Sequence, residues 1–475
     1  MKSPAVDTGA LDGILERAAD AEGYAAWWAR ARATGWCRHP VRLVGSTVRA
    51  DPDSGELHSL FSSADQPDRV LLKACGQRRA TVCPTCSAIY RSDAFQLVAA
   101  GLRGGKGIPE QVTAHPAVFA TLTAPSFGPV HSLRADHGQP RPCRPNNNRT
   151  CRHGQPQACE VVHDGDDPTL GQPTCPDCFD YPAAVLWNAL AGILWQRTTI
   201  AVRRHLARLA GIPRAALAEN ARLSFAKVIE YQRRGVVHLH IVARLDGAGD
   251  QVVPPPPSFG PDLLLLAIHR AAGGVRVPYP NPGPLTGDAR WGEQTDLHIV
   301  GDGGGPVPGA AAAYLAKYAT KSTDPAGLLD HRLRDSDLDR LDDLLTPHLA
   351  RMVRTAWELG GNPDLADFRL RAWAHTLGFR GHWLTKSRAY STTFGTLRAA
   401  RTEWSARRHG EQPAPSQAVK VNDWHFAGRG WSTPGDSWLA ETAAAETADA
   451  RRAAREDRRA AHDNTNDEGG NDGPA

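Results

Sequence analysis

The sequence has no long hydrophobic run: its most apolar stretch, Leu263 to Ile268, is far too short to cross a bilayer. The first residues are mixed and acidic, and they lack the basic-then-apolar order of a secretory signal. The sequence also lacks the Gly-x-x-x-x-Gly-Lys-Ser/Thr pattern of a P-loop, which argues against a fused nucleotide-driven motor. These absences predict a cytoplasmic protein that makes no membrane contact.

Lysine and methionine are also scarce. The 475 residues include eight lysines and two methionines, so arginine carries nearly all of the positive charge. GC-rich coding would explain this bias, and so would contact with phosphate, for which the guanidinium fork is well shaped. Outside the C-terminal tail, Arg and Lys cluster at 197–208, 222–244 and 370–401, which is compatible with a nucleic-acid path. The net charge of +4 does not decide between these explanations.

The remaining composition is that of an ordinary globular protein, with 41% hydrophobic and 22% charged residues. The length is sufficient for two or three cores. We predict four regions: an N-terminal helical and cysteine-rich region at 1–112, a principal domain at 113–330 with a cysteine-rich insertion at 140–181, a helical and basic region at 331–436, and a helix that frays into a disordered tail at 437–475.

Hydrophobic periodicity places the main elements along the chain. Short strands and turns are expected at 37–72. Helices are expected at 10–34, 89–102, 183–209, 262–272 and 335–360, with another that begins near Pro308. Longer strands are expected at 118–123, 223–231, 236–245 and 295–300.

The segment Val236-Val237-His238-Leu239-His240-Ile241-Val242 carries the strongest local signal. Because side chains alternate along a strand, His238 and His240 point to one face while Leu239 and Ile241 point to the other. Two imidazoles about 7 Å apart along a strand can converge on one metal ion. Taken alone, the pattern is more often a pair of ordinary partly buried histidines.

Glu230 ends the preceding strand, eight residues before His238. If the intervening turn has an odd number of residues, such as Arg233-Arg234-Gly235, Glu230 lies opposite His238 and on the same face. A carboxylate and two imidazoles then form a site for Mg²⁺ or Mn²⁺ with positions left for phosphate oxygens and water. A four-residue turn would place Glu230 on the wrong face.

The segment from Tyr314 to Lys321 repeats Tyr-x-x-Lys twice. On a helix Tyr314 and Tyr318 share a face, about 6 Å apart along the axis, and Lys317 and Lys321 fall on a neighbouring face. An ordinary amphipathic helix with packed tyrosines and solvated lysines would give the same pattern. A third segment, Phe119-Ala120-Thr121-Leu122-Thr123-Ala124-Pro125, is a strand that ends in a turn, and alone it indicates no more than a core strand.

The order and spacing of these three segments resemble the HUH endonuclease family, in particular the rolling-circle replication initiators of actinobacterial plasmids and integrative elements. The similarity extends from about Cys37 to Arg398 and includes the segments Cys83–Asp93, Cys175–Tyr181 and Gly378–Arg388. The doubled Tyr-x-x-Lys is also similar to the replication protein of small single-stranded DNA phages, in which both tyrosines act.

The resemblance implies an α+β fold: a ferredoxin- or RRM-like central antiparallel sheet with His238 and His240 on its middle strand, the tyrosine helix beside it, and zinc-ordered insertions. It also implies that a metal on Glu230, His238 and His240 orients a phosphodiester in origin DNA while a tyrosine attacks it. The products would be a 5′-phosphotyrosine and a 3′-OH primer. Lys317 or Lys321 would stabilise the charge, and a host helicase and polymerase would continue replication.

Nine cysteines, with two Cys-x-x-Cys pairs, favour metal binding over disulfides in a cytoplasmic protein. One structural zinc site is predicted from Cys37, Cys75, Cys83 and Cys86. The second joins Cys175 and Cys178 to two of Cys143, Cys151, His153 and Cys159, with Cys151 and Cys159 as the first choice. The pairing stays open, because a site shared between the two Cys-x-x-Cys pairs would also satisfy the spacing.

The segment His375 to Arg398 mixes basic and aromatic residues and is a candidate DNA contact, through phosphate binding and base stacking. Its candidate contact residues are Arg380, His382, Lys386 and Arg388. A solvated basic face is an equal alternative. For the whole chain, two other functions remain: an HUH transposase with paired tyrosines, and a zinc-containing DNA-binding regulator without catalysis.

Overall fold

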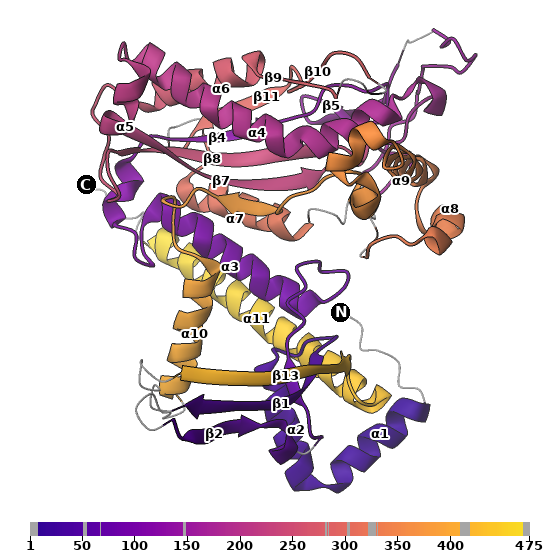
Figure 1. Cartoon of the computed structure of the whole chain (residues 1–475), viewed down its shortest axis with the longest axis vertical. Coiled ribbons are helices and arrows are strands. Elements are labelled where there is room, and N and C mark those ends of the chain that lie inside the picture. The colour runs from indigo at the N-terminus through magenta and orange to yellow at the C-terminus, as the bar shows by residue number, and fades with distance from the viewer. Residues whose placement is uncertain are drawn as a thin grey trace. The chain divides into compact units, whose positions relative to one another are not determined.

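The computed structural model of the protein describes residues 8–50, 55–66, 68–145, 149–280, 283, 285–301, 305–321, 329, 331–408 and 419–468. The chain forms two compact units (Figure 1). The smaller unit combines Met1–Tyr90 with Arg401–Ala475, and the larger unit is Arg91–Ala400. Among the described residues, every helix is too short or too polar to span a bilayer.

The larger unit is built on a five-stranded sheet in which all neighbouring strands are antiparallel, in the order β11-β4-β8-β7-β12. The prediction of a mixed α and β fold around a central antiparallel sheet is therefore confirmed, with the two histidines on the middle strand. The strands are β4 (Ala117–Leu122), β7 (Ala221–Tyr231), β8 (Val237–Gly247), β11 (Thr295–Ile299) and β12 (Leu384–Lys386).

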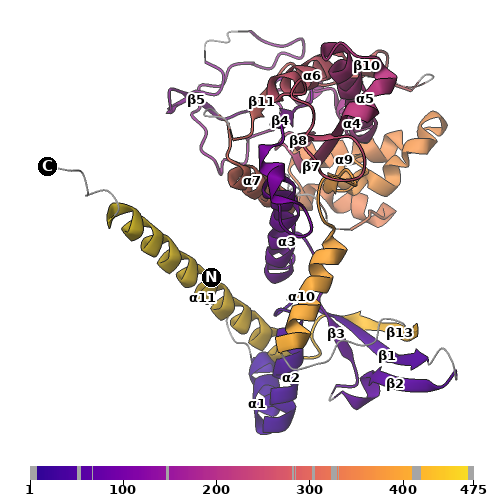
Figure 2. The ribbon, with the colours of Figure 1, turned by 90° about the vertical axis from the view of Figure 1, so that its left-hand side faces the viewer.

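Helices cover both faces of this sheet (Figures 1 and 2). α4 (Tyr181–Leu209) and α6 (Pro261–Gly274) lie on one face, and α7 (Pro308–Lys321) lies on the other. Leu239 and Ile241 of β8 are fully buried in the main core, which also contains most of the apolar side chains of α4 and α6. Each such buried side chain contributes roughly 1.5–3 kcal/mol of hydrophobic stabilisation. His238 and His240 alternate with these residues along β8 and so point to the opposite face of the sheet.

Shorter elements complete the larger unit. They are β5 (Arg134–Asp136), β6 (Gln139–Arg141), α5 (Leu217–Asn220), β9 (Arg276–Pro278), β10 (Asp288–Arg290), α8 (Leu341–Leu344) and α9 (Pro347–Leu359), with several 3₁₀ turns. The helix expected at 335–360 is thus divided: a 3₁₀ turn, α8 and α9 replace it, because Thr346 caps α9 at its own N-terminus and Pro347 occupies the first turn.

The smaller unit has a sheet centred on β1 (Val41–Ala50), which pairs antiparallel with β2 (Leu57–Ser62), β3 (Leu71–Lys73) and β13 (Val419–Arg429). β13 was not expected from the sequence, because it is exposed along most of its length and shows no clean alternation. Its partner also lies more than 360 residues away in the chain.

Helices α1 (Thr8–Ala19), α2 (Ala21–Ala33) and α11 (Pro434–Glu468) accompany this sheet. The single helix expected at 10–34 is two helices, since the Asp20 carboxylate caps α2 by accepting a bond from Gly23 N at 2.9 Å. α11 packs on α1, and its Asp436 pairs with Arg17 at 3.0 Å. The buried core of this unit consists of Trp27, Ala31, Trp36 and Ala443, and the partly buried Trp431 packs against it.

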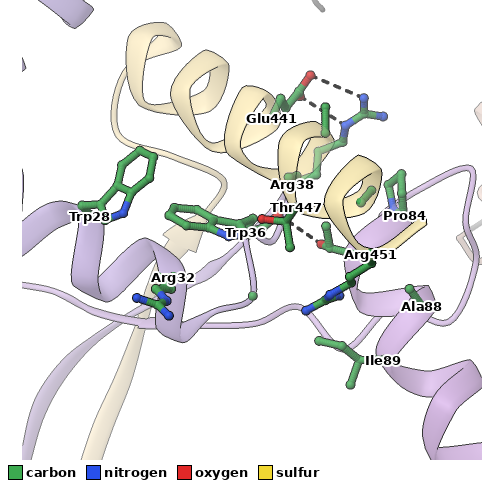
Figure 3. A pocket seen from close by; sticks show the side chains of 15 residues that line it. Trp28, Arg32, Trp36, Arg38, Pro84, Ala88, Ile89, Glu441, Thr447 and Arg451 are labelled. Atoms are coloured by element: carbon green, nitrogen blue, oxygen red, sulfur yellow. Dashed lines mark hydrogen bonds and ion pairs between the residues drawn. The ribbon is translucent and has the colours of Figure 1, made fainter. Parts of the chain in front are cut away.

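A hollow of about 670 Å³ opens on this unit (Figure 3). Its lining combines the indoles of Trp28 and Trp36 with aliphatic residues and with the guanidinium groups of Arg32, Arg38 and Arg451. Arg38 is paired with Glu441 of α11 at 3.2 Å.

The two units cut across the four regions predicted from the sequence. The boundaries expected at 112/113, 330/331 and 436/437 do not coincide with the division, which falls within α3 (Pro84–Arg103) and α10 (Phe394–Arg408). The reason is that both ends of the chain join one sheet through β1 and β13, a contact that local composition does not reveal.

Candidate metal and tyrosine site

The β7–β8 hairpin places Glu230 opposite His238, as the odd-turn hypothesis requires. Gln232 N donates to Val236 O at 2.9 Å, which leaves Arg233, Arg234 and Gly235 as a three-residue turn. Gly235 has φ +74, a left-handed conformation that glycine adopts without strain. The register predicted from the sequence is confirmed.

The three side chains converge on one point of the sheet. Glu230 Oε2 lies 2.8 Å from His238 Nε2 and 3.2 Å from His240 Nε2. The Glu230 and His238 side chains are 13% and 15% exposed, and His240 is 2% exposed. The site is thus open to solvent at Glu230 and His238 and closed behind His240.

Electrostatics favour a neutral imidazole and an ionised carboxylate at this point. Burial opposes ionisation of Glu230, but its contacts with the two histidines outweigh burial and lower the pKa of the carboxyl group. Burial lowers the pKa of His240, against the attraction of Glu230. Histidine binds a cation in its neutral form, and glutamate binds one in its ionised form.

The donor set fits a divalent metal. One atom from each residue lies within 4.8 Å of the others. One carboxylate and two imidazoles suit Mn²⁺, and also Mg²⁺ when phosphate oxygens and water complete the shell.

β4 supports this site from the neighbouring strand. Thr121 lies opposite His240, and its Oγ1 is 3.1 Å from His240 Nδ1. When His240 binds a metal through Nε2, its Nδ1–H donates to Thr121, which fixes the ring orientation. The Phe119–Pro125 segment therefore contributes more than a core strand, because Thr121 contacts the ring of His240.

Both tyrosines of α7 face the histidines. The ring centroid of His240 is 5.0 Å from that of Tyr314 and 4.8 Å from that of Tyr318, and the two tyrosine rings are 4.5 Å apart. Phe119 packs against Tyr314 edge to face at 5.4 Å. The helical i,i+4 spacing thus brings two phenols to the triad of Glu230, His238 and His240, and Tyr314 is 38% exposed.

The phenol of Tyr314 needs a nearby cation if it is to ionise. Burial, the contact with Tyr318 and the negative charges of Glu230 and Asp296 all raise its pKa. Lys317 is exposed, with Nζ 5.3 Å from the centre of the Tyr318 ring. The side chain of Lys321, the other lysine of the motif, lies outside the described residues.

Asn188 of α4 is a positioning residue that the sequence did not indicate. Its Nδ2 donates to Gly235 O and Leu377 O at 3.0 Å, and its Oδ1 accepts from Val237 N at 3.0 Å. The side chain is fully buried with all of these polar groups paired. It ties the turn and the first residue of β8 to α4, and a lone asparagine inside a long helix carries no sequence signal for this role.

The predicted DNA-contact residues do not share one environment. Arg380, His382 and Arg388 are exposed. Lys386 ends β12, and its Nζ donates to the carbonyl oxygens of Ser391 and Arg388 at 2.8 and 3.2 Å. Partial burial lowers the pKa of Lys386. Lys386 therefore also holds the chain that follows β12.

The first predicted cysteine group is brought together in the smaller unit. Cys37, Cys75, Cys83 and Cys86 have all sulfur atoms within 4.8 Å of one another. The Sγ distances are 3.8 Å for Cys37–Cys83 and 3.7 Å for Cys75–Cys86. Zn–S bonds of about 2.3 Å in a tetrahedron place sulfur atoms about 3.8 Å apart, so the group fits a structural zinc.

The second predicted zinc group contains His153 in place of Cys159, so it differs by one ligand from the set predicted first. Cys175 and Cys178 lie with Cys151 and His153, whose Nδ1 is 3.6 Å from Cys175 Sγ and 3.3 Å from Cys178 Sγ. Cys159 does not join them; it lies beside Cys143 and two histidines. Sequence distance does not separate the two arrangements, because Cys151 and Cys159 are both in a segment without regular structure.

Comparison with known proteins identifies the family. A family model described as "RepSA: Replication initiator protein, pSAM2" matches residues 23–445, which include the Glu230 triad, both tyrosines and all nine cysteines. A replication initiator protein of Streptomyces ambofaciens is 42% identical over 447 residues, which cover 91% of this chain and 92% of the relative. No solved structure matches the chain. The chain therefore belongs to the RepSA family of replication initiator proteins.

Proposed function

We propose that this replication initiator is a nickase that starts rolling-circle replication by a tyrosine attack on one strand of its origin DNA. One observation carries the proposal: a carboxylate and two imidazoles converge on a single point, and two phenol rings lie within 5.0 Å of one of those imidazoles. Such an arrangement supports the proposal, because a phenol would serve as the nucleophile beside a site suited to a phosphate-binding cation.

The chain's own residues would perform the transfer as follows. A phenolic oxygen of Tyr314 or Tyr318 forms a bond to phosphorus, while the bond to the 3′ oxygen breaks. The phenol loses its proton and the leaving 3′ oxygen gains one, which gives a 5′-phosphotyrosine and a free 3′-OH. The reverse transfer rejoins the strand, because the phosphotyrosine conserves the bond energy.

Glu230, His238 and His240 would hold the metal, with Thr121 orienting His240. A bound Mg²⁺ or Mn²⁺ supplies Lewis-acid stabilisation of the phosphate oxygens. Lys317, beside Tyr318, would offset the negative charge that develops during attack. A second phenol on the same helix face would allow a second cut while the first tyrosine is still linked to DNA.

We also propose that single-stranded and duplex origin DNA contacts the basic residues Arg380, His382 and Arg388, and that a host polymerase extends the 3′-OH while a host helicase opens the duplex. The cytoplasm remains the predicted location. Zinc at the cysteine groups would have a structural role.

The test is incubation of the protein with labelled single-stranded origin DNA and Mn²⁺, followed by a denaturing gel. Wild type is expected to give a covalent protein–DNA band. The single variants Tyr314→Phe and Tyr318→Phe identify the first nucleophile, because the variant that lacks it loses the covalent band and the other variant retains the band. The double variant is expected to give no covalent band. Tyr279→Phe, which removes a phenol packed against the core elsewhere in the same unit, is the matched control.

If no cognate origin DNA gives an adduct, the nickase proposal fails and a DNA-binding regulator takes its place. An adduct that persists in the double variant would assign the attack to another residue. A transposase would instead cut and join the ends of an element, which the same gel distinguishes when end sequences replace the origin.

A further inference from the structure

We propose a third zinc site, formed by Cys143, Cys159 and His163 of the cysteine-rich insertion and by His131, which precedes the insertion. The four side chains offer two imidazole nitrogens and two thiolates, and the ligand atoms all lie within 4.8 Å of one another. Two thiolates with two imidazoles form one of the ligand sets of structural zinc.

The distances and directions within the group suit a tetrahedral ion. Cys159 Sγ lies 3.5 Å from His163 Nε2, and Cys143 Sγ lies 4.0 Å from His131 Nδ1. Bonds of about 2.0–2.3 Å in a tetrahedron place such atoms about 3.3–3.8 Å apart, so the first distance fits and the second is slightly longer. The centroids of the two imidazole rings are 5.2 Å apart, and the ring planes are nearly perpendicular, at 83°.

Main-chain hydrogen bonds bring the ligands together from separate segments. Arg144 N donates to Cys159 O at 2.8 Å, and Cys159 N donates back to Arg144 O at 3.1 Å, which sets Cys143 beside Cys159. His131 comes from a third segment, which is attached to the chain near Gln172 because His131 N donates to Gln172 O at 2.9 Å. The convergence is therefore built into the backbone and is not a chance contact of surface side chains.

A carboxylate orients one of the ligands. His163 Nδ1 lies 2.6 Å from Asp167 Oδ2, which leaves Nε2 directed to Cys159. The other oxygen of Asp167 accepts from Thr169 N at 2.8 Å and from Thr169 Oγ1 at 2.7 Å. A carboxylate on the far nitrogen of a histidine is the usual outer partner of a zinc-bound imidazole.

The cysteine count is consistent with three sites. The three groups contain four, three and two cysteines, so each of the nine cysteines has a place in one of them. With two sites of four ligands, at least one cysteine would be left over.

The site has a defined structural consequence. The loop that carries Asp167 packs on the β7–β8 turn: Arg233 donates to Asp167 O at 3.1 Å and also to Gly165 O. Gly171, at φ +84, lies so close that a Cβ there would be 2.4 Å from the Arg233 carbonyl carbon. The third zinc would thus hold the insertion against the hairpin that carries Glu230 and His238.

The test uses full-length protein that is purified with zinc and then freed of loosely bound ions. Mass spectrometry measures the number of zinc ions bound per chain. Cys143→Ser/Cys159→Ser is expected to contain one equivalent of zinc less than wild type. Cys151→Ser/Cys178→Ser is expected to lose a different equivalent, so the quadruple variant loses two. His131→Gln should also lose one, whereas His137→Gln, which changes a nearby histidine that is 97% exposed, should lose none.

Asp167→Asn keeps all four ligands, so it tests the site even if the ligand variants misfold. It should retain the zinc but release it to a chelator about 10- to 100-fold more readily. Unchanged zinc in Cys143→Ser/Cys159→Ser would overturn the proposal. The proposal would also be overturned if both double variants and the quadruple variant each lost one equivalent of zinc, because that result indicates one shared site. Neither result depends on nicking activity.

Discussion

The central sheet and the cysteine-rich insertion place their metal-binding groups by different means. On the sheet, strand pairing determines where Glu230, His238 and His240 lie, and a large core behind β8 holds the strands. In the insertion, the buried hydrophobic side chains among the described residues between Val130 and Thr174 are Cys143 and Leu170. We therefore expect the sheet to form its site without a metal, and the insertion to depend on metal for its order.

This difference explains why the two regions should respond differently to the same treatment. Loss of a ligand on the sheet removes metal affinity but leaves the hydrogen-bonded strands. Loss of a ligand in the insertion removes the main link among segments that have little core of their own.

Removal of zinc should produce the largest difference. We expect a strong chelator to make residues 131–174 at least tenfold more sensitive to limited proteolysis, because unligated loops open locally at little cost. The β7–β8 hairpin should stay protected by its core contacts. Mass analysis of the fragments locates the cuts, and zinc added back is the control. Equal cleavage of the two regions would show that the insertion is ordered without metal.

Asn188→Leu should destabilise the sheet region by about 2–4 kcal/mol, because it leaves Val237 N and two buried carbonyl groups unpaired. Urea denaturation measures the change. Asn220→Ala, which removes one bond from a partly buried amide to Ala216 O, should cost about 1 kcal/mol or less. Equal losses in the two variants would contradict the role assigned to Asn188.

Stability should fall as the pH drops from 6.5 to 4 because of His348. This residue lies between Tyr181 and the turn carbonyl of Arg234, and burial lowers its pKa from 6.5 to about 4. In that interval the unfolded chain binds a proton that the folded chain does not, so up to roughly 3 kcal/mol of stability is lost.

The matched variant for this effect is His348→Gln, which should flatten the dependence of urea stability on pH in this range. Part of the slope should remain, since burial also lowers the pKa of His375 to about 4. A slope that is unchanged in His348→Gln would mean that other groups cause the acid sensitivity.

The smallest effect is expected at Thr121, which orients a ligand without touching the metal. Thr121→Val should weaken Mn²⁺ binding at the Glu230 triad by about tenfold, near the lower limit for loss of an outer-shell partner. Titration calorimetry on zinc-loaded protein measures this, and Thr121→Ser, which keeps the hydroxyl, should bind nearly as wild type does. Comparable weakening by Ser and Val would assign the effect to packing.

Features set by short stretches of chain were predictable. The alternation of His238 and His240, the parity of the β7–β8 turn and the i,i+4 spacing of the tyrosines follow from strand and helix geometry, and the structure agrees with each. β13 was missed, because its exposed residues give no periodic signal and it pairs with a strand at the other end of the chain.

Local sequence specifies which chemical groups are available and which neighbouring residues share a face: a carboxylate, a pair of imidazoles, a pair of phenols and an excess of thiols. The tertiary structure alone decided that Asn188 fixes the hairpin turn, that Thr121 orients His240, and that Cys159 lies with Cys143 rather than Cys151. The physical reason is that these contacts join segments far apart in the chain or pass through irregular loops, where no repeat of the backbone relates sequence spacing to distance.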